Sequence, residues 1–555
     1  MINATSKREN LINTGKAIVF TLTLVVVICI QFRVQLLNHF SVLYGDSYDA
    51  TITTVILEHW FNTFRGDSNW SQLYYYFPYT NTLAQTDGHF LIGVIYSVIR
   101  LFESDVYLAS EWSNLLLRVI GFVAFFLMAR KVFTFSFFWS LLAASLFILS
   151  NNMTIHGNRI QLATVGFAPV MAMLLFYTYK ALEAGNKSNI LKYGISAAVF
   201  LGAWTLTCFY ITWFFIYFCI FFVCIAFYLA PKTTKANIFK QCKSSYKALV
   251  IVFLASIISQ LPLLSVYLPK AKESGMRPYE VALSNTVPLE GILQVGQGNL
   301  LFGELYNKLT TSLSPTYIPN GEYYNTGISP IIFILFIAGA LIAIRKRHQL
   351  GSSLIWPAMA SASLLTWVFI LNIKGHSAWF FLYMLFPGAK ALQVVSIYQI
   401  FLAIPVISLA IWYLSKACKN PPKILMAIIV SLLILEELNH AYVSLVREDE
   451  LAKSELSTPP PAECSSFYVS GWAKQPNEGD IILNMYAHNI TAMLIAEKIS
   501  LPTINGMASF NPRDWNFAYP NRPDYDQRIS QYISNHQLSN VCKLDLESKA
   551  WSKTW

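Results

Sequence analysis

Two carboxylates stand three residues apart in the segment GDSYD, residues 45–49, shortly after the first long apolar run. If a helix begins at Ser47, Asp46 takes its N-cap position and Asp49 lies at N3 on the same face. One interpretation is structural, because acidic residues in a first turn stabilise a helix through its dipole. The other is chemical, because one carboxylate can act as a general base while the second orients a substrate or shares a divalent cation.

Cationic side chains that could hold a phosphate stand in a few other polar segments between apolar runs. Arginine suits phosphate because its donors form a fixed fork. The alternative for each cation is an exposed loop charge or a contact with lipid headgroups. Asp87 and His89 begin an apolar helical segment, where both contact a substrate or, alternatively, Asp87 is an N-cap and His89 a stray polar residue. The candidate cations are His156, Arg159, Arg277, Lys374, His376 and Lys390.

The composition determines what must position these residues. The chain has 555 residues, of which 55% are hydrophobic and 13% are charged, whereas soluble domains carry about 25% charged residues. The surplus apolar surface must therefore face lipid. The first run, from Lys16 to about Arg33, lacks a small-residue cleavage site and is expected to be a retained helix. The expected spans are residues 17–35, 112–130, 134–150, 162–180, 190–207, 208–230, 247–268, 328–345, 353–373, 393–415 and 423–443.

The basic residues decide how the short run 89–103 is interpreted. If it is re-entrant or interfacial, every strong basic cluster falls on the side of the N-terminus, as the positive-inside rule requires. If it spans, all later clusters move to the opposite side. The net charge of +10 thus reflects orientation and does not indicate nucleic-acid binding. The clustered residues are Lys7, Arg8, Lys16, Arg130, Lys131, Lys180, Lys187, Lys192, Lys232, Lys235, Lys240, Lys243, Lys247, Arg345, Lys346, Arg347, Lys416, Lys419 and Lys423.

This threading gives a membrane domain, residues 1–443, with a cytoplasmic N-terminus and large outer loops at 36–111 and 269–327. A charged and Pro-rich linker, 444–463, leads to an extracytoplasmic lobe, 464–555. The fold class is therefore an all-α polytopic membrane protein of about eleven transmembrane helices with a small α/β C-terminal lobe.

The lobe contains strand-like runs FYVSG, DIILN and NVCKLDL and helical patterns at 491–498 and 524–534. Cys464 and Cys542 lie near its ends, where an oxidising compartment allows a disulfide. The stretch TINGMASFNPRDWNF, residues 503–517, is either a long packed loop or an aromatic edge that contacts sugars. Glu436 and Glu437 lie at the outer end of the last expected span, which favours a water-exposed helix terminus over an intramembrane functional site.

The chain resembles the GT-C-type membrane glycosyltransferases in its whole architecture. At residue level the resemblance rests on GDSYD and on YYYFPYTNTLAQTDGHF, residues 74–90, which is similar to a segment of uncharacterised bacterial members. The chain departs from subgroups with an adjacent Asp-Glu pair, because Ser47 follows Asp46. The subgroup, the donor and metal dependence therefore stay open, and a divalent cation bound by Asp46 and Asp49 is one option.

The resemblance implies a bacterial cytoplasmic-membrane enzyme that moves a sugar from a polyprenyl-phosphate carrier to a glycan, lipid or protein acceptor on the outer face. Asp46 would be the base and Asp49 the second carboxylate, while outer cations hold the phosphate. One alternative is a transporter or flippase of lipid-linked glycans, which predicts repeat symmetry and ionisable residues deep within spans. Another is a non-catalytic membrane scaffold, which predicts that neutralising both carboxylates is tolerated.

Overall fold

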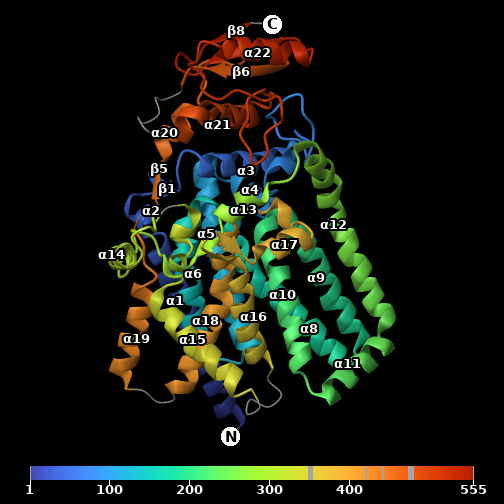
Figure 1. Cartoon of the computed structure of the whole chain (residues 1–555), viewed down its shortest axis with the longest axis vertical. Coiled ribbons are helices and arrows are strands. Elements are labelled where there is room, and N and C mark those ends of the chain that lie inside the picture. Colours follow the sequence, from blue (N-terminus) through green and yellow to red (C-terminus); the bar gives the residue numbers. More distant parts are fainter. Residues whose placement is uncertain are drawn as a thin grey trace.

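The computed structural model describes residues 2–319, 321–347, 354–418, 422–440, 443–472 and 481–553. Long helices run side by side from the N-terminus at one end to a C-terminal lobe at the other (Figure 1). Within the described residues, eight helical segments are long and apolar enough to cross a membrane. They are Asn13–Gln31, Val106–Lys131, Phe137–Asn158, Ile160–Glu183, Lys187–Thr207, Phe209–Leu229, Tyr246–Ser274 and Val395–Ala417.

Each of the eleven expected spans contains a helix, so the protein is a mostly helical polytopic membrane protein. In three of them the helical segment is shorter than a full crossing: α15 (Pro330–Arg345), α16 (Ile355–Ile370) and α19 (Lys423–Leu435). The expectation that the last span reaches residue 443 is wrong, because α19 ends at Leu435 and a strand begins at Val443. The other helices of the bundle are α1 (Ile2–Gln31), α5 (Val106–Lys131), α6 (Phe137–Leu149), α7 (Asn151–Ile155), α8 (Ala168–Glu183), α9 (Lys187–Thr207), α10 (Phe209–Leu229), α12 (Tyr246–Ser274) and α18 (Tyr398–Ala417). Helices α6 and α8 are also short, but each reaches spanning length together with the short helices next to it.

The basic clusters can be placed relative to the two ends of the bundle. Helix α11 (Lys232–Ser244), which carries four of the clustered lysines, lies at the end where the N-terminus is found (Figure 1). The C-terminal ends of α15 and α18 and the start of α19 lie at the same end. Lys419 lies outside the described residues. This arrangement agrees with the placement of the basic loops on one side.

The first outer loop crosses the top of the bundle beneath the C-terminal lobe (Figure 1). Its helix α4 has 11 residues, which is about 17 Å at 1.5 Å per residue, against a hydrocarbon core of about 30 Å. Ile92, Tyr96 and Gly93 are buried, whereas Val94 and Val98 are exposed. This length and this amphipathic division favour an interfacial position. The loop's elements are α2 (Arg33–Leu37), β1 (Val42–Tyr44), α3 (Asp49–Arg65), η1 (Thr82–Gln85) and α4 (Phe90–Arg100).

The second large outer loop and the loop after α16 meet through a small sheet. Strand β2 (Val287–Pro288) pairs in parallel with β3 (Leu371–Ile373), which pairs antiparallel with β4 (His376–Ser377). The remaining short elements are η2 (His156–Asn158), η3 (Ile160–Phe167), α13 (Tyr279–Ser284), η4 (Leu289–Leu293), α14 (Gly303–Leu313), η5 (Glu322–Asn325), α17 (Trp379–Leu385), η6 (Ala389–Ala391) and η7 (Val395–Ile397).

The C-terminal lobe is a small α/β unit. Its sheet joins β6 (Ser466–Ser470) in parallel to β7 (Val541–Asp545), and β7 antiparallel to β8 (Trp551–Lys553). Helices α21 (Ile481–Ile499) and α22 (Tyr525–Asn535) accompany it. The expected strand DIILN is wrong, since α21 begins at Ile481; Asp480 lies outside the described residues. The expected linker contains most of β5 (Val443–Val446), which pairs with β1, and α20 (Arg447–Lys453).

The lobe is tied to the first outer loop by backbone hydrogen bonds. The Tyr76 amide donates to the Asn505 carbonyl at 3.1 Å, and the Thr503 amide donates to the Tyr74 carbonyl at 2.7 Å. Glu497, buried in α21, accepts at its Oε1 from the Tyr74 amide at 3.0 Å. A lobe this small is marginal by itself, and these contacts hold it over the loop that carries the paired carboxylates.

Glu436 and Glu437 bind the first turns of two neighbouring helices. The Glu436 carboxylate accepts from the amides of Ile331 and Ile332 in α15 at 2.8 and 3.0 Å. Glu437 accepts from the Asn151 amide of α7 at 2.6 Å. A carboxylate at a helix N-terminus satisfies orphan donors and complements the dipole. Both residues are buried at 0% and 4% exposure, so the expected water-exposed terminus is wrong and they fasten α19 to the bundle.

Candidate active site

The GDSYD segment forms a tight turn before α3. Gly45 has φ +92°, and a Cβ at this position would lie 2.5 Å from the Cβ of Asn158, so only glycine fits here. Asp46 Oδ1 accepts from the amides of Tyr48 at 3.0 Å and Asp49 at 2.9 Å. The helix begins at Asp49, two residues later than expected. The N-cap is therefore Tyr48 and Asp49 is the first residue of α3, so the expected N-cap position of Asp46 and N3 position of Asp49 are wrong. Asp46 closes the turn just before the helix through Oδ1 and keeps its second carboxylate oxygen outside these bonds.

Asp49 is paired with one of the candidate cations. Its Oδ2 accepts from Arg159 Nε at 2.8 Å, and the two side chains are 26% and 25% exposed. The two residues are 110 positions apart in the chain, so the fold brings them together. The pKa of Asp46 lies above its usual value, because surrounding protein desolvates the carboxylate and because Asp49 carries a like charge nearby. Asp46 is nevertheless exposed, as a base that meets a substrate must be.

An aromatic side chain of the lobe, Tyr486, lies near Tyr48 of the GDSYD turn. Burial and the nearby Asp49, Tyr486 and Asp46 raise the pKa of the Tyr48 hydroxyl. Tyr486 of α21 stacks on Trp515, with ring centroids 6.4 Å apart and planes 23° from parallel. Trp515 in turn packs edge-on against Tyr76, whose hydroxyl donates to Asn511 Oδ1. Part of the 503–517 segment therefore packs against the first outer loop next to the Asp46 turn.

A second polar group surrounds Arg277, just after α12. Arg277 Nη2 donates to the Ser509 carbonyl at 2.8 Å, and its guanidinium lies 4.5 Å from the Phe510 ring centroid. Its amide donates to the Lys390 carbonyl at 3.4 Å, and the Lys390 ammonium lies 5.5 Å from the Tyr383 ring. Burial lowers the pKa of Arg277, an effect that Tyr210 partly opposes. Arg277 and Lys390 thus lie together beneath the 503–517 segment.

Asp87 and His89 dock on the corner between α9 and α10. Asp87 Oδ1 accepts from the Phe209 amide at 3.2 Å, and the His89 amide donates to the Thr207 carbonyl at 2.9 Å. Between them, a Cβ on Gly88 would lie 2.1 Å from the Leu206 carbonyl oxygen. Burial raises the pKa of Asp87 to about 6 and lowers that of His89 to about 4. Asp87 therefore binds the first amide of α10, whereas α4 begins at Phe90 with no side-chain cap hydrogen bond, so the expectation that Asp87 caps α4 is wrong.

The remaining candidate cations differ in their surroundings. His156 stands three residues before Arg159 in the chain and is 5% exposed. Its Nδ1 lies 2.8 Å from the Asn152 carbonyl oxygen. Lys374 and His376 are exposed at the turn of the β3–β4 hairpin. Among the hydrogen bonds and ion pairs of the described residues, none joins this hairpin to Asp46 or Arg159. The fold therefore separates the six candidate cations into three places, which hold His156 and Arg159, Arg277 and Lys390, and Lys374 and His376.

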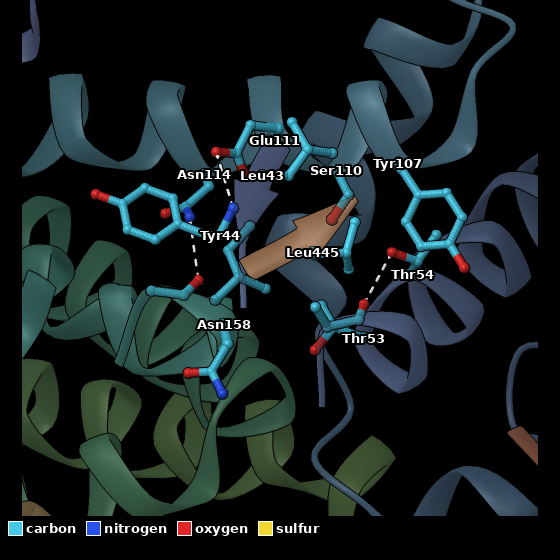
Figure 2. Close-up of a pocket in the computed structure, with 13 residues that line it drawn as sticks. Leu43, Tyr44, Thr53, Thr54, Tyr107, Ser110, Glu111, Asn114, Asn158 and Leu445 are labelled. Atoms are coloured by element: carbon cyan, nitrogen blue, oxygen red, sulfur yellow. Dashed lines mark hydrogen bonds between the residues drawn. The ribbon is translucent and has the colours of Figure 1, made fainter. Parts of the chain in front are cut away.

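Residues that the sequence analysis did not select line a small polar recess behind α3, with about 310 Å³ of space that includes open solvent. Figure 2 shows Tyr44, Glu111 and Asn114 on one side of it and Thr53, Thr54 and Tyr107 on the other. Glu111 Oε1 accepts from Gln35 Nε2 at 2.8 Å, and Asn114 donates to the Gly157 carbonyl at 3.2 Å.

Arg118 extends this polar face one helical turn deeper into α5. It is 1% exposed and donates to the Met153 carbonyl at 3.2 Å, while its Nη1 is buried with no partner among the described residues. Glu111, Asn114 and Arg118 are spaced three and four apart, so they share one face of the helix. That spacing in an otherwise apolar run is the signal that could have identified them.

No group of three or more His, Cys, Asp or Glu side chains suited to a metal occurs within the described residues. Asp46 and Asp49 offer at most two carboxylates, and one oxygen of each is already hydrogen-bonded. Hard divalent cations prefer six or more oxygen ligands. The side chains at this turn therefore do not form a complete metal site.

No known protein family matches the sequence, and no curated protein matches it either. Among solved structures, the chain is similar to the oligosaccharyltransferase of Archaeoglobus fulgidus in its apo form. The match has 12% sequence identity and a TM-score of 0.49, and it covers 94% of this chain and 69% of the other.

Proposed function

We propose that this protein is a GT-C-type glycosyltransferase that moves a sugar from a polyprenyl-phosphate carrier to an envelope acceptor outside a bacterial cytoplasmic membrane. The observation that carries the proposal is the Asp46 turn, where an exposed carboxylate with a raised pKa stands beside the Asp49–Arg159 pair. The turn lies directly after the first span and beneath the aromatic side chains of the lobe. The acceptor could be a glycan, a lipid or a protein.

The reaction follows from the chemistry of these groups. An acceptor hydroxyl attacks the anomeric carbon of the sugar and gives its proton to Asp46. The bond between the anomeric carbon and the phosphate oxygen breaks, and polyprenyl phosphate leaves with that electron pair. Arg159 fixes Asp49 so that it can orient the acceptor. Arg277 and Lys390 supply positive charge for the leaving phosphate.

Transfer and transport can be separated in vesicles that contain the purified protein. We expect labelled sugar to move from a panel of polyprenyl-phosphate sugars to an added envelope acceptor fraction, with the carrier lipid staying in its leaflet. The measurement is label in the acceptor against label in the lipid of each leaflet. Movement of intact lipid-linked sugar without transfer would instead support the flippase alternative, which the buried Arg118 and Glu111 within α5 favour.

Replacing Arg277 tests the phosphate-binding role. We expect Arg277→Ala to raise the KM for the polyprenyl-phosphate donor about 10-fold to 100-fold, because a charge-assisted hydrogen bond contributes about 1.5–3 kcal/mol. Donor titrations of the transfer rate measure this change. Arg522→Ala is a matched control, since Arg522 also lies 4.5 Å from an aromatic ring, that of Tyr519. Equal KM values for both variants would contradict the role of Arg277.

A further inference from the structure

A recess opens at the outer ends of the interfacial helices, where α3, α4 and α21 end together. It contains about 740 Å³ of space free of atoms, open solvent included. Residues from the first outer loop line one side of it and residues from the lobe line the other. The lining residues are Glu58, Phe61, Asn62, Arg65, Asp67, Arg100, Ser104, Val106, Leu451, Lys498, Ile499 and Ser500.

Three cations from three segments face this recess. Arg65 ends α3, Arg100 ends α4, and Lys498 lies in the last turn of α21. The lining contains two carboxylates, Glu58 and Asp67, so the lining carries a formal charge of 3 − 2 = +1. Clustered cations just outside an apolar surface attract the phosphates of lipid headgroups.

On one side of the recess, Arg100, Glu58 and Tyr96 form a hydrogen-bonded group. Arg100 donates from Nε and Nη2 to the two Glu58 oxygens at 2.9 and 3.0 Å, and the Tyr96 hydroxyl donates to Glu58 at 2.6 Å. The guanidinium groups of Arg65 and Arg100 lie 5.4 and 5.0 Å from the ring of Phe61. Glu58 is therefore neutralised by Arg100, and both arginines lie against the ring of Phe61.

The other two cations are available to a ligand. Arg65 Nε lies 3.2 Å from Asp67 Oδ2, and 58% of the Arg65 side chain is exposed. Lys498 donates to the carbonyl and hydroxyl oxygens of Ser454 at 3.4 and 3.2 Å. Burial lowers the pKa of Lys498, although Glu455 and Glu58 partly oppose this. A phosphate beside Lys498 would favour its charged form.

The chain beside these cations presents apolar side chains to the outside. Phe64, adjacent to Arg65, is 52% exposed, and Val98 on α4 is 56% exposed. Leu101 and Phe102, directly after Arg100, are 68% and 88% exposed. Exposed residues of this kind next to cations are typical of a surface that enters the lipid interface. Exposed apolar side chains thus flank in sequence the two arginines that line the recess.

We infer that this recess binds the phosphate of a bilayer phospholipid between Arg65 and Lys498, with the acyl chains along Val98, Leu101 and Phe102. A soluble phosphate would use the cations alone, whereas a phospholipid uses the cations and the apolar surface together. Because Lys498 belongs to the lobe and Arg65 to the first outer loop, the bound lipid bridges the two. The inference is independent of the proposed transfer reaction.

The test uses the delipidated full-length protein in detergent and measures its melting temperature against added ligand. We expect phosphatidylglycerol to raise the melting temperature, and diacylglycerol with the same acyl chains or inorganic phosphate to have little effect. The double variant Arg65→Gln/Lys498→Met should bind phosphatidylglycerol roughly 30-fold more weakly, as expected for the loss of two interfacial cations.

Lys308→Gln is the matched control, because Lys308 is an outer-face cation on α14 with a 79% exposed side chain outside the recess. If the double variant does not fold, Arg65→Gln alone gives the same comparison at an exposed position. An unchanged affinity in the variant would overturn the inference. Equal stabilisation by inorganic phosphate or by diacylglycerol would also overturn it, since a phospholipid would then be unnecessary.

Discussion

We expect Asp46→Asn to lower the rate of sugar transfer by at least about 100-fold, the usual contribution of a general base. The amide is nearly the same size as the carboxylate, and its oxygen can still accept from the amides of Tyr48 and Asp49. The turn and the start of α3 should therefore be preserved, while the group loses the ability to take a proton. Transfer assays on purified protein, normalised to its membrane level, measure the loss.

Asp526→Asn is the matched control for this variant. Asp526 is an outer-face aspartate with a 65% exposed side chain that pairs with Lys543 at 3.3 Å. It should keep wild-type transfer, because it lies on α22, away from the Asp46 turn. An Asp46→Asn protein with the activity of this control would refute the assigned base, and equal losses in both would indicate a general effect of the charge change.

The pH dependence of transfer gives a second readout of the same base. Because the pKa of Asp46 is raised, its ionised fraction falls as the pH decreases through a value above the usual aspartate pKa of about 3.9. The transfer rate should decline over the same interval. Asp49→Asn removes the neighbouring like charge, so the decline in its residual rate should move to lower pH. A shift to higher pH would contradict the electrostatic coupling of the two carboxylates.

The sequence predicted the architecture because its signals are strong and additive. Long apolar runs and basic clusters identify spans and their order without any knowledge of packing. Predictions that depend on tertiary contacts are less accurate. The DIILN run has a strand-like pattern, but α21 begins at Ile481 within it. The later residues of α21, such as Glu497, pack on the first outer loop and continue the same helix. The length of α19 was overestimated for a similar reason, since Glu436 and Glu437 stop it by binding the ends of other helices.

The candidate site shows the same difference between signals within one segment, which the sequence reveals, and contacts between distant segments, which it does not. The Asp46–Asp49 pair was visible because both residues lie within one short segment. The Asp49–Arg159 pair depends on two segments 110 residues apart, so the sequence could offer Arg159 only as one of six cations. Lys374 and His376 were grouped with it on charge and sidedness alone, and the hairpin exposes them. Arg118 and Glu111 were missed because an apolar run hides their shared face until the helix period is applied.

We expect Cys542→Ser to lower the stability of the C-terminal lobe by about 2–5 kcal/mol, because a disulfide restricts the unfolded chain. Cys464 and Cys542 are bonded, with Cα atoms 5.7 Å apart, and they stand 78 positions apart in the chain. The bond links the start of β6 to β7, the parallel pair at the centre of the small sheet. Urea-dependent proteolysis of the lobe in membranes, with the wild type under oxidising conditions as reference, measures the change.

Reduction provides an independent arm of that experiment. A thiol reductant should bring the wild-type lobe to the stability of Cys542→Ser and leave the variant unchanged. Cys224→Ser, which alters a free and exposed cysteine of α10, should behave as the wild type in both conditions. Because α21 places Tyr486 near Tyr48 of the Asp46 turn, a loosened lobe should also slow transfer. Equal stability of the reduced and oxidised wild type would mean that docking on the first outer loop, and not the disulfide, holds the lobe over the site.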